Sequence, residues 1–140
     1  MNSRVERWQP VCLSLFRFIT GLLLFQYGVA KHLKFPAGSP FAKTEMLSLA
    51  GVAGALELVL GALLMIGLFT RGSTFLLSGL MAFAYFLGHY PRGFYPVING
   101  GTAAILFCFA FLYLFTAGGG PLSVDAWLDR KTSHSETVTP

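Results

Sequence analysis

The chain has 140 residues, of which 54% are hydrophobic and only 11% are charged, and its formal net charge is +4. Soluble domains carry about 25% charged residues, so this composition excludes an ordinary soluble domain and indicates a membrane protein. Nearly all of the charged residues lie in short gaps between apolar runs, and the basic ones form no basic face with interleaved aromatic residues. A nucleic-acid partner is therefore not expected, and the basic excess is attributed to contact with lipid head groups.

Four apolar runs follow one another along the chain. They cover roughly residues 11–30, 47–69, 73–90 and 96–116. Each approaches the ~20 residues that a helix needs to cross ~30 Å of hydrocarbon. Helices are favoured because a backbone in lipid must satisfy its own polar groups, and the runs do not alternate as barrel strands do. The sequence therefore predicts an all-α membrane protein, a four-helix transmembrane bundle.

Glycine, proline and charged residues separate these runs and stop the fourth one at Gly118. Ser123 then predicts the start of a short C-terminal amphipathic helix over residues 124–130, with Asp125 as an acid in its first turn. The domain prediction is one transmembrane domain over residues 1–131. Residues 132–140 are polar and are expected to form a disordered tail.

The charges in the gaps predict how the bundle is oriented. An even number of spans places both termini on one side, together with the tryptophans Trp8 and Trp127. That side holds the basic residues Arg4, Arg7, Arg71, Arg130 and Lys131, and the other side holds Lys31, Lys34, Lys43 and Arg92. The positive-inside rule then predicts that both termini are cytoplasmic.

Glycines mark the expected packing faces of the first two helices. In the first run, Arg17, Gly21, Gly28 and Lys31 lie on one helical stripe. In the second run, Gly54, Glu57 and Gly61 share a face. Small residues allow helix backbones to approach closely in lipid, so Gly21, Gly28, Gly54 and Gly61 are predicted helix-packing glycines.

Glu57 lies in the middle of an apolar span, where an ionised group costs about 3 kcal/mol or more and usually faces a partner. Three interpretations stay open. In the first, Arg17 and Glu57 form a buried ion pair, because their depths differ by only about 8 Å at 1.5 Å per residue. In the second, Lys31, Glu57, His89 and Asn99 line a polar cavity that binds a quinone head group or small solute, or passes protons. In the third, the charged side chains reach the lipid head groups without a defined partner.

His89 and the segment around Asn99 each allow two interpretations. His89 fits either an interfacial hydrogen-bonding residue or a quinone ligand. The sequence Asn99-Gly100-Gly101 fits tight packing of the fourth helix against the second, or exposed N–H groups at a helix start. The complete predicted polar site is Arg17, Lys31, Glu57, His89 and Asn99.

No metal site is predicted from the cysteines and histidines. Cys12 and Cys108 each lie inside an apolar run and are interpreted as buried thiols, and His32 and His134 lie in separate segments. The sequence also contains no phosphate-binding loop and no haem-binding histidine pair. If electrons move through this protein, a bound quinone or a partner protein is expected to carry them.

These motifs together resemble the DoxX family of small bacterial four-helix membrane proteins, roughly from Phe16 to Trp127. The matching features, in order, are Arg17, Gly21, Gly28, Lys31, Glu57-Leu58-x-x-Gly61, Gly67-Leu68-x-Thr70-Arg71, His89, Pro96-x-x-Asn99-Gly100-Gly101 and Gly118-x-Gly120-x-x-Ser123-x-Asp125. One position departs from the family pattern: Thr102 stands where similar sequences often carry a glutamate. Threonine can donate a hydrogen bond but cannot titrate at neutral pH, so any proton handling by that acid is absent here.

The resemblance implies a role rather than a reaction. Some relatives are small subunits of quinone-linked oxidoreductases that act on thiosulfate, and others are associated with thiol, oxidative-stress or quinone-detoxification systems. The expected function is an accessory subunit of a quinone- or thiol-linked redox system in the bacterial inner membrane. If it belongs to an enzyme, it is expected to be at most a non-catalytic or quinone-binding subunit of a membrane oxidoreductase. The alternatives are a small-solute or proton transporter, or a structural membrane scaffold. The expected partners are the bilayer and a soluble redox protein, and a homo-oligomer stays open.

Overall fold

A computed structural model of the chain describes residues 3–136, and within that range it is helical with connecting turns and no strand. The prediction of an all-helical protein is confirmed. In chain order, the elements are α1 (Ser3–Glu6), α2 (Gln9–His32), α3 (Leu49–Ile66), α4 (Thr70–Phe83), the π-helix η1 (Ala84–His89), the 3₁₀ helix η2 (Tyr90–Arg92), α5 (Pro96–Asn99), α6 (Thr102–Ala117) and α7 (Val124–Glu136).

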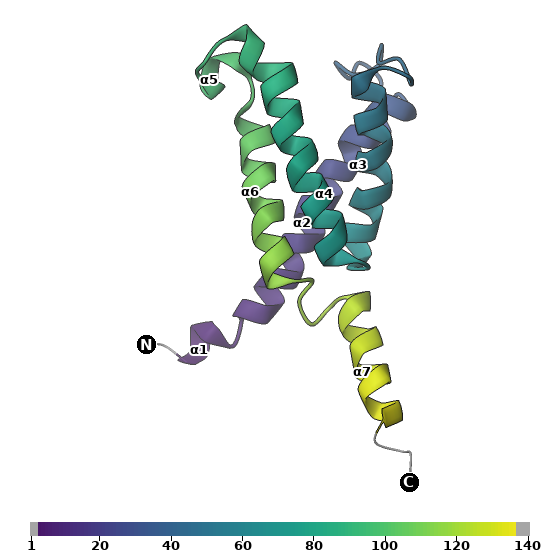
Figure 1. The fold of residues 1–140 in the computed structure, drawn as a ribbon, viewed down its shortest axis with the longest axis vertical. Coiled ribbons are helices and arrows are strands. Elements are labelled where there is room, and N and C mark those ends of the chain that lie inside the picture. The colour runs from purple at the N-terminus through teal and green to yellow at the C-terminus, as the bar shows by residue number, and fades with distance from the viewer. Residues whose placement is uncertain (1–2, 137–140) are drawn as a thin grey trace.

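Four long helices form the body of the molecule, and they pack as two pairs (Figure 1). α2 lies along α3, α4 lies along α6, and contacts between α3 and α4 join the two pairs. Helices α1 and α7 project from the end where α3 turns into α4, whereas α5 and the α2–α3 connection lie at the opposite end (Figure 1). These two ends are called below the α7 end and the α5 end.

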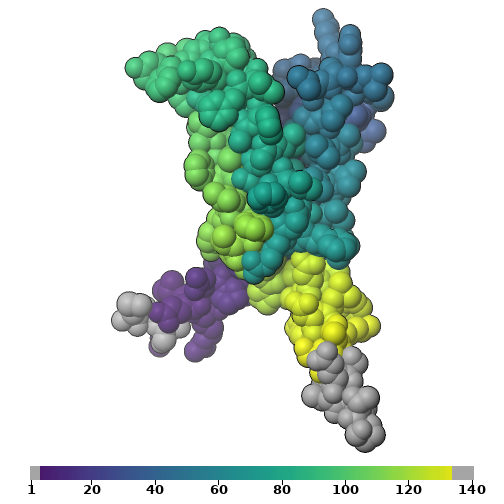
Figure 2. Space-filling view, in the orientation of Figure 1, coloured from purple at the N-terminus to yellow at the C-terminus, as the bar shows by residue number. Residues whose placement is uncertain are grey.

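A small apolar core joins the two helix pairs, and the outward faces of the bundle are also apolar. The core side chains are Leu24, Leu64, Leu77, Met81, Phe111 and Leu114. Large apolar side chains such as Leu15, Val59, Phe75 and Phe109 are exposed on the four long helices. Apolar surface of this extent marks a contact with lipid or with another protein. Figure 2 shows that α7, in yellow, extends away from this body.

Glycine allows α2 and α3 to approach each other closely. A Cβ atom on Gly28 would lie 2.6 Å from the backbone nitrogen of Leu58 and 2.7 Å from the carbonyl oxygen of Gly54. A Cβ atom on Gly61 would lie 3.1 Å from the Cα of Phe25. Gly21 likewise faces the backbone around Met65, so all four predicted packing glycines lie in this contact.

Two stretches of the described chain, Arg4–His32 and Leu49–Ile66, are long and apolar enough to cross a membrane, and Thr102–Ala117 is a shorter apolar helix. The predicted third and fourth helices have different boundaries in the structure. The third begins earlier, at Thr70, and changes into a π-helix after Phe83. A bundle of four complete spans therefore stays a prediction.

The fourth helix starts at Thr102 rather than at Pro96, because the chain turns at Gly100. Gly100 has a φ angle of +72°, a conformation that favours glycine, and it ends the short helix α5. The side chain of Asn99 accepts a hydrogen bond from the N–H of Gly101 at 2.8 Å. A Cβ atom on Gly101 would lie 2.7 Å from the ring of Tyr85, so this glycine approaches η1 and not α3, the second of the predicted helices.

The C-terminal helix is longer than predicted. Ser123 caps it as expected, because its hydroxyl accepts a hydrogen bond from the N–H of Ala126 at 3.2 Å. However, α7 continues to Glu136 and does not end at Arg130. The predicted tail therefore overlaps α7 over residues 132–136, and its last residues, 137–140, lie outside the described range.

Substituting Gly28 by alanine should weaken the α2–α3 contact. The added methyl group would meet backbone atoms that cannot move independently, and overpacking of this kind costs about 1–3 kcal/mol. We expect a lower midpoint of thermal unfolding for the purified protein in detergent. The matched control is Gly79→Ala on α4, where a Cβ atom would have no neighbour within 4 Å. Equal midpoints for the two variants would contradict the close contact.

Candidate functional site

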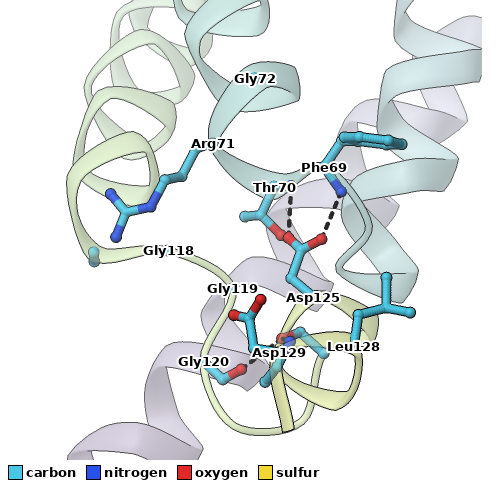
Figure 3. A pocket seen from close by; sticks show the side chains of 13 residues that line it. Phe69, Thr70, Arg71, Gly72, Gly118, Gly119, Gly120, Asp125, Leu128 and Asp129 are labelled. Atoms are coloured by element: carbon cyan, nitrogen blue, oxygen red, sulfur yellow. Dashed lines mark hydrogen bonds between the residues drawn. The ribbon is translucent and has the colours of Figure 1, made fainter. Parts of the chain in front are cut away.

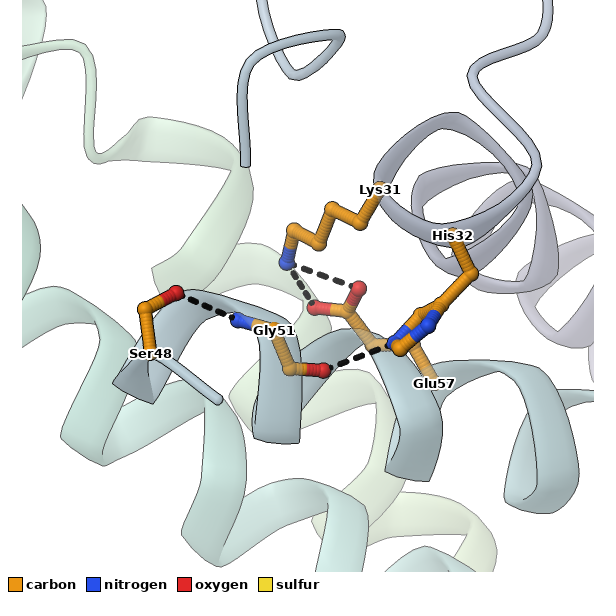
Figure 4. A network of polar contacts seen from close by, with 5 residues as sticks. All are labelled: Lys31, His32, Ser48, Gly51 and Glu57. Carbon is orange, nitrogen blue, oxygen red and sulfur yellow. Dashed lines mark hydrogen bonds and ion pairs between the residues drawn. The ribbon is translucent and has the colours of Figure 1, made fainter. Parts of the chain in front are cut away.

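The clearest polar site inside the bundle is an ion pair between α2 and α3. The Nζ atom of Lys31 donates to both carboxylate oxygens of Glu57, each at 2.8 Å (Figure 4). The two residues are 8% and 4% exposed. An ion pair within an apolar interior is stable only if its geometry is good, because both charges have lost their hydration. Here one ammonium satisfies both oxygens of one carboxylate.

The packing glycines make room for this pair. Gly28 and Lys31 are three residues apart on α2, and Gly54 and Glu57 are three apart on α3, so each charge lies beside a glycine of its own helix. A Cβ atom on Gly54 would lie 2.9 Å from the Cβ and the Cδ of Lys31. A larger residue at position 54 would therefore displace the lysine side chain that reaches Glu57.

A third titratable residue, His32, lies beside the pair. Its Nε2 atom is 2.8 Å from the carbonyl oxygen of Gly51, in the first turn of α3 (Figure 4). The hydroxyl of Ser48 caps that turn by accepting a hydrogen bond from the N–H of Gly51 at 3.1 Å. Lys31 and His32 at the end of α2 and Glu57 in the middle of α3 thus bring three ionisable side chains together.

The loop between α2 and α3 covers this group of residues. The Nζ atom of Lys34 donates to the carbonyl oxygens of Lys31 and Thr44, which ties the loop to the end of α2. The ring centroid of Phe41 lies 5.5 Å from the Nζ atom of Lys31, within the range of a cation–π contact. An aromatic ring therefore lies beside the ammonium group of the pair.

The predicted ion pair between Arg17 and Glu57 is wrong. Arg17 is 3% exposed, but its guanidinium lies at the other end of α3 and binds backbone carbonyl groups. It donates to the carbonyl oxygens of Leu64, Met65, Gly119 and Leu122 at 2.5 to 2.9 Å. The depth argument misplaced it because a helix C-terminus offers free carbonyl groups, which can satisfy a buried arginine as a carboxylate does.

The predicted cavity of four residues is divided between two places. His89 and Asn99 hold their own loop together: the Nδ1 atom of His89 is 3.0 Å from the carbonyl oxygen of Asn99. The side-chain nitrogen of Asn99 donates to the carbonyl oxygen of Gly93 at 2.8 Å. No hydrogen bond or ion pair joins this loop to Lys31 or Glu57 within residues 3–136.

Asp125 has a role that the sequence analysis missed. Its carboxylate accepts hydrogen bonds from the backbone N–H groups of Phe69 and Thr70, at 2.9 and 2.8 Å. Helix α4 has no cap of its own, so a residue of α7 supplies it. One indication of this role is present in the sequence, because no capping side chain precedes Thr70. The residue that provides the cap, Asp125, lies 55 positions away in the sequence.

The two cysteines are free, and the interpretation of both as buried thiols is wrong for one of them. Cys12 is exposed on α2, whereas Cys108 is half-buried on α6 with its sulfur 3.6 Å from the hydroxyl of Ser78. Among the residues that the structure describes, no three histidine, cysteine or acidic side chains lie close enough together to hold a metal ion.

The polar groups between α2 and α3 are one cation and one anion, so the pair carries no net charge. A carbonyl or hydroxyl group of a ligand would find a donor on Lys31 and an acceptor on Glu57. The site places one hydrogen-bond donor group and one acceptor group side by side inside an apolar bundle.

Comparison with known proteins connects the chain to one family. The family model described as DoxX matches residues 12–90, which include both members of the Lys31–Glu57 pair. A protein of Haemophilus influenzae, described as uncharacterized, is 38% identical over 132 residues, which are 89% of this chain and 96% of that protein. No solved structure matches this chain.

Removing one member of the ion pair should destabilise the protein more than removing both. Glu57→Gln leaves a buried ammonium without its counter-charge, which costs about 3–5 kcal/mol, whereas Lys31→Met with Glu57→Gln leaves no charge. We expect the single variant to accumulate poorly and to unfold at a lower temperature, and the double variant to recover much of the loss. A double variant no better than Glu57→Gln would contradict the pairing.

Proposed function

This chain belongs to the DoxX family, and on that premise we propose that it is an accessory subunit of a quinone- or thiol-linked redox system in the bacterial inner membrane. The observation that carries this proposal is the Lys31–Glu57 pair, a buried donor and acceptor enclosed in an otherwise apolar bundle. In this role the protein positions a quinone or a partner and does not itself carry electrons.

The membrane placement is supported by the surface of the bundle and by its buried charges. Its exposed faces are apolar, and two of its helices have the length and composition of membrane spans. Arg17, Lys31 and Glu57 are each bonded inside the protein, as ionisable groups within a bilayer must be. We propose four spans, with α4 and η1 together forming the third and α6 the fourth.

We propose that the α7 end faces the cytoplasm. Helices α1 and α7 project from the same end, as an even number of spans requires (Figure 1). Basic residues, among them Arg4, Arg71 and Arg130, lie in or beside the elements of that end. The Lys31–Glu57 pair then lies toward the other side of the membrane.

The proposed contact with a quinone uses Lys31 and Glu57, with His32 beside them. A quinone head group needs a hydrogen-bond donor for its carbonyl oxygens, and a hydroquinone needs an acceptor for its hydroxyl protons. The pair offers both, and the ring of Phe41 offers an aromatic face. His89 and Asn99 are engaged within their own loop, so we assign them to holding that loop.

A structural membrane scaffold without activity is the second candidate, and one observation favours it. Each of the three buried ionic side chains has its hydrogen bonds satisfied by the protein itself. A structural scaffold requires only that its buried charges are stabilised in this way and requires no ligand. Quinone binding is the property that separates the two candidates.

The orientation can be tested by labelling single cysteines from either side of the membrane. In a background with Cys12→Ser and Cys108→Ser, we expect Gly38→Cys in the α2–α3 loop to react with an impermeant maleimide added to intact cells. Ser3→Cys should react only after the cytoplasmic side is opened. Labelling of Gly38→Cys only from the cytoplasm would reverse the proposed orientation.

The redox role can be tested by purifying the full chain in mild detergent and identifying bound quinones and proteins by mass spectrometry. We expect quinone to copurify with the wild type and to be lost from Lys31→Met with Glu57→Gln, which keeps the site uncharged. The matched control is Gly79→Ala, which lies in open space on α4. If neither quinone nor a redox protein copurifies with the wild type, the structural scaffold is the better interpretation.

A further inference from the structure

An open cavity of 490 Å³ lies at the α7 end, away from the Lys31–Glu57 pair. Its walls come from the start of α4, the loop after α6 and the first turns of α7 (Figure 3). Three glycines of the loop, Gly118, Gly119 and Gly120, form one wall with backbone atoms alone. The cavity takes no part in the proposed redox role.

The inner wall of this cavity holds a polar group without a partner. Thr70 is 1% exposed, and its hydroxyl oxygen is buried with no hydrogen-bond partner in the described part of the chain. A buried hydroxyl without a partner costs about 1–3 kcal/mol. Gly119 keeps this hydroxyl free, since a Cβ atom at that position would lie 2.8 Å from it. The cavity therefore contains a donor or acceptor that a ligand, or a water that the ligand holds, would satisfy.

A cation and an anion face the cavity from different walls (Figure 3). The Nη1 atom of Arg71 donates to the carbonyl oxygens of Phe115 and Thr116, both at 2.8 Å, which fixes the guanidinium beside Gly118. Its Nε and Nη2 atoms have no partner among the described residues. The carboxylate of Asp129 on α7 is likewise unpaired within residues 3–136. Asp125 also lines the cavity, and each of its carboxylate oxygens already accepts one hydrogen bond from a backbone N–H group.

The rim of the cavity is apolar and lies where an interfacial group would be found. Phe69 and Leu128 line it and are both well exposed. On the neighbouring turn of α7, the Nζ atom of Lys131 lies 4.1 Å from the ring centroid of Trp127. Tryptophan and lysine side by side are typical of the boundary between lipid and water. A ligand here would have polar charges at one end and an apolar part that meets this rim.

We propose that this cavity binds the phosphoethanolamine group of a membrane phospholipid, with its phosphate at Arg71 and Thr70 and its ammonium at Asp129. Arginine matches phosphate geometry, and a carboxylate pairs with a primary ammonium. An anionic lipid that has no ammonium group would leave the Asp129 carboxylate without a partner and beside a second negative charge. The inference rests on the proposed membrane placement but not on the redox role.

The test is a titration of the full, delipidated chain in detergent with three lipids of the same acyl chains, followed by native mass spectrometry. The lipids are phosphatidylethanolamine, phosphatidylglycerol and phosphatidylcholine. We expect phosphatidylethanolamine to bind about tenfold more tightly than the other two, the value of one charge-assisted hydrogen bond. Asp129→Asn should remove this preference, and Arg71→Gln should weaken binding of all three lipids.

Asp129→Asn is the decisive variant, because its carboxylate is exposed and holds no other part of the protein. Its matched control is Glu6→Gln, which removes one negative charge at the same end but outside the cavity. Equal binding of the three lipids by the wild type, or a preference that survives Asp129→Asn, would overturn the proposal. Free phosphoethanolamine that binds as tightly as the lipid would overturn the lipid as the source. A protein released from membranes without detergent would instead overturn the membrane placement.

Discussion

The contact between α2 and α3 depends on one constraint: a lysine and a glutamate in an apolar interior must meet each other. Lys31 and Glu57 meet this constraint with two short hydrogen bonds, and they can do so only because glycine brings the two backbones close together. The pair also fixes the register of the helices, since sliding one helix by a single turn of 5.4 Å would separate the charges. Close approach and charge pairing are therefore one feature of this bundle.

Backbone groups rather than opposite charges stabilise the other end of the bundle. Arg17 binds carbonyl groups at the end of α3 and in the loop after α6, whereas Asp125 binds N–H groups at the start of α4. The positive Arg17 lies at the carbonyl end of α3, where the partial charge is negative, and the negative Asp125 lies at the amide end of α4, where the partial charge is positive. Arg17 and Asp125 thus hold the turn between α3 and α4 from both sides.

The sequence predicted the elements better than it predicted their partners. The apolar runs and the glycines indicated the helices and the faces that pack, because both depend on local composition and on helical spacing. Of the two basic residues considered beside Glu57, Arg17 was wrong as its ion-pair partner and Lys31 is the one that binds it, since depth along a helix does not say which of the two faces the carboxylate. The bonds of Arg17 and the cap of α4 by Asp125 could not be predicted, because they join residues that are distant in the sequence through backbone groups that every residue has. Gly100 and Gly101 indicated an irregularity before the fourth helix. The sequence did not say which element Gly101 packs against, because that depends on the position of Tyr85.

The bonds of Arg17 to Gly119 and Leu122 have a consequence for the order in which the chain matures. A ribosome synthesises α2 and α3 before the segment after α6, so at that stage only two of the four carbonyl partners of Arg17, those of Leu64 and Met65, are present. The remaining hydrogen bonds of the guanidinium form only after the loop that contains Gly119 and Leu122 has been synthesised and has packed against α2. Assembly of the α7 end is thus coupled to completion of translation through residue 125, where the carboxylate that caps α4 finally arrives.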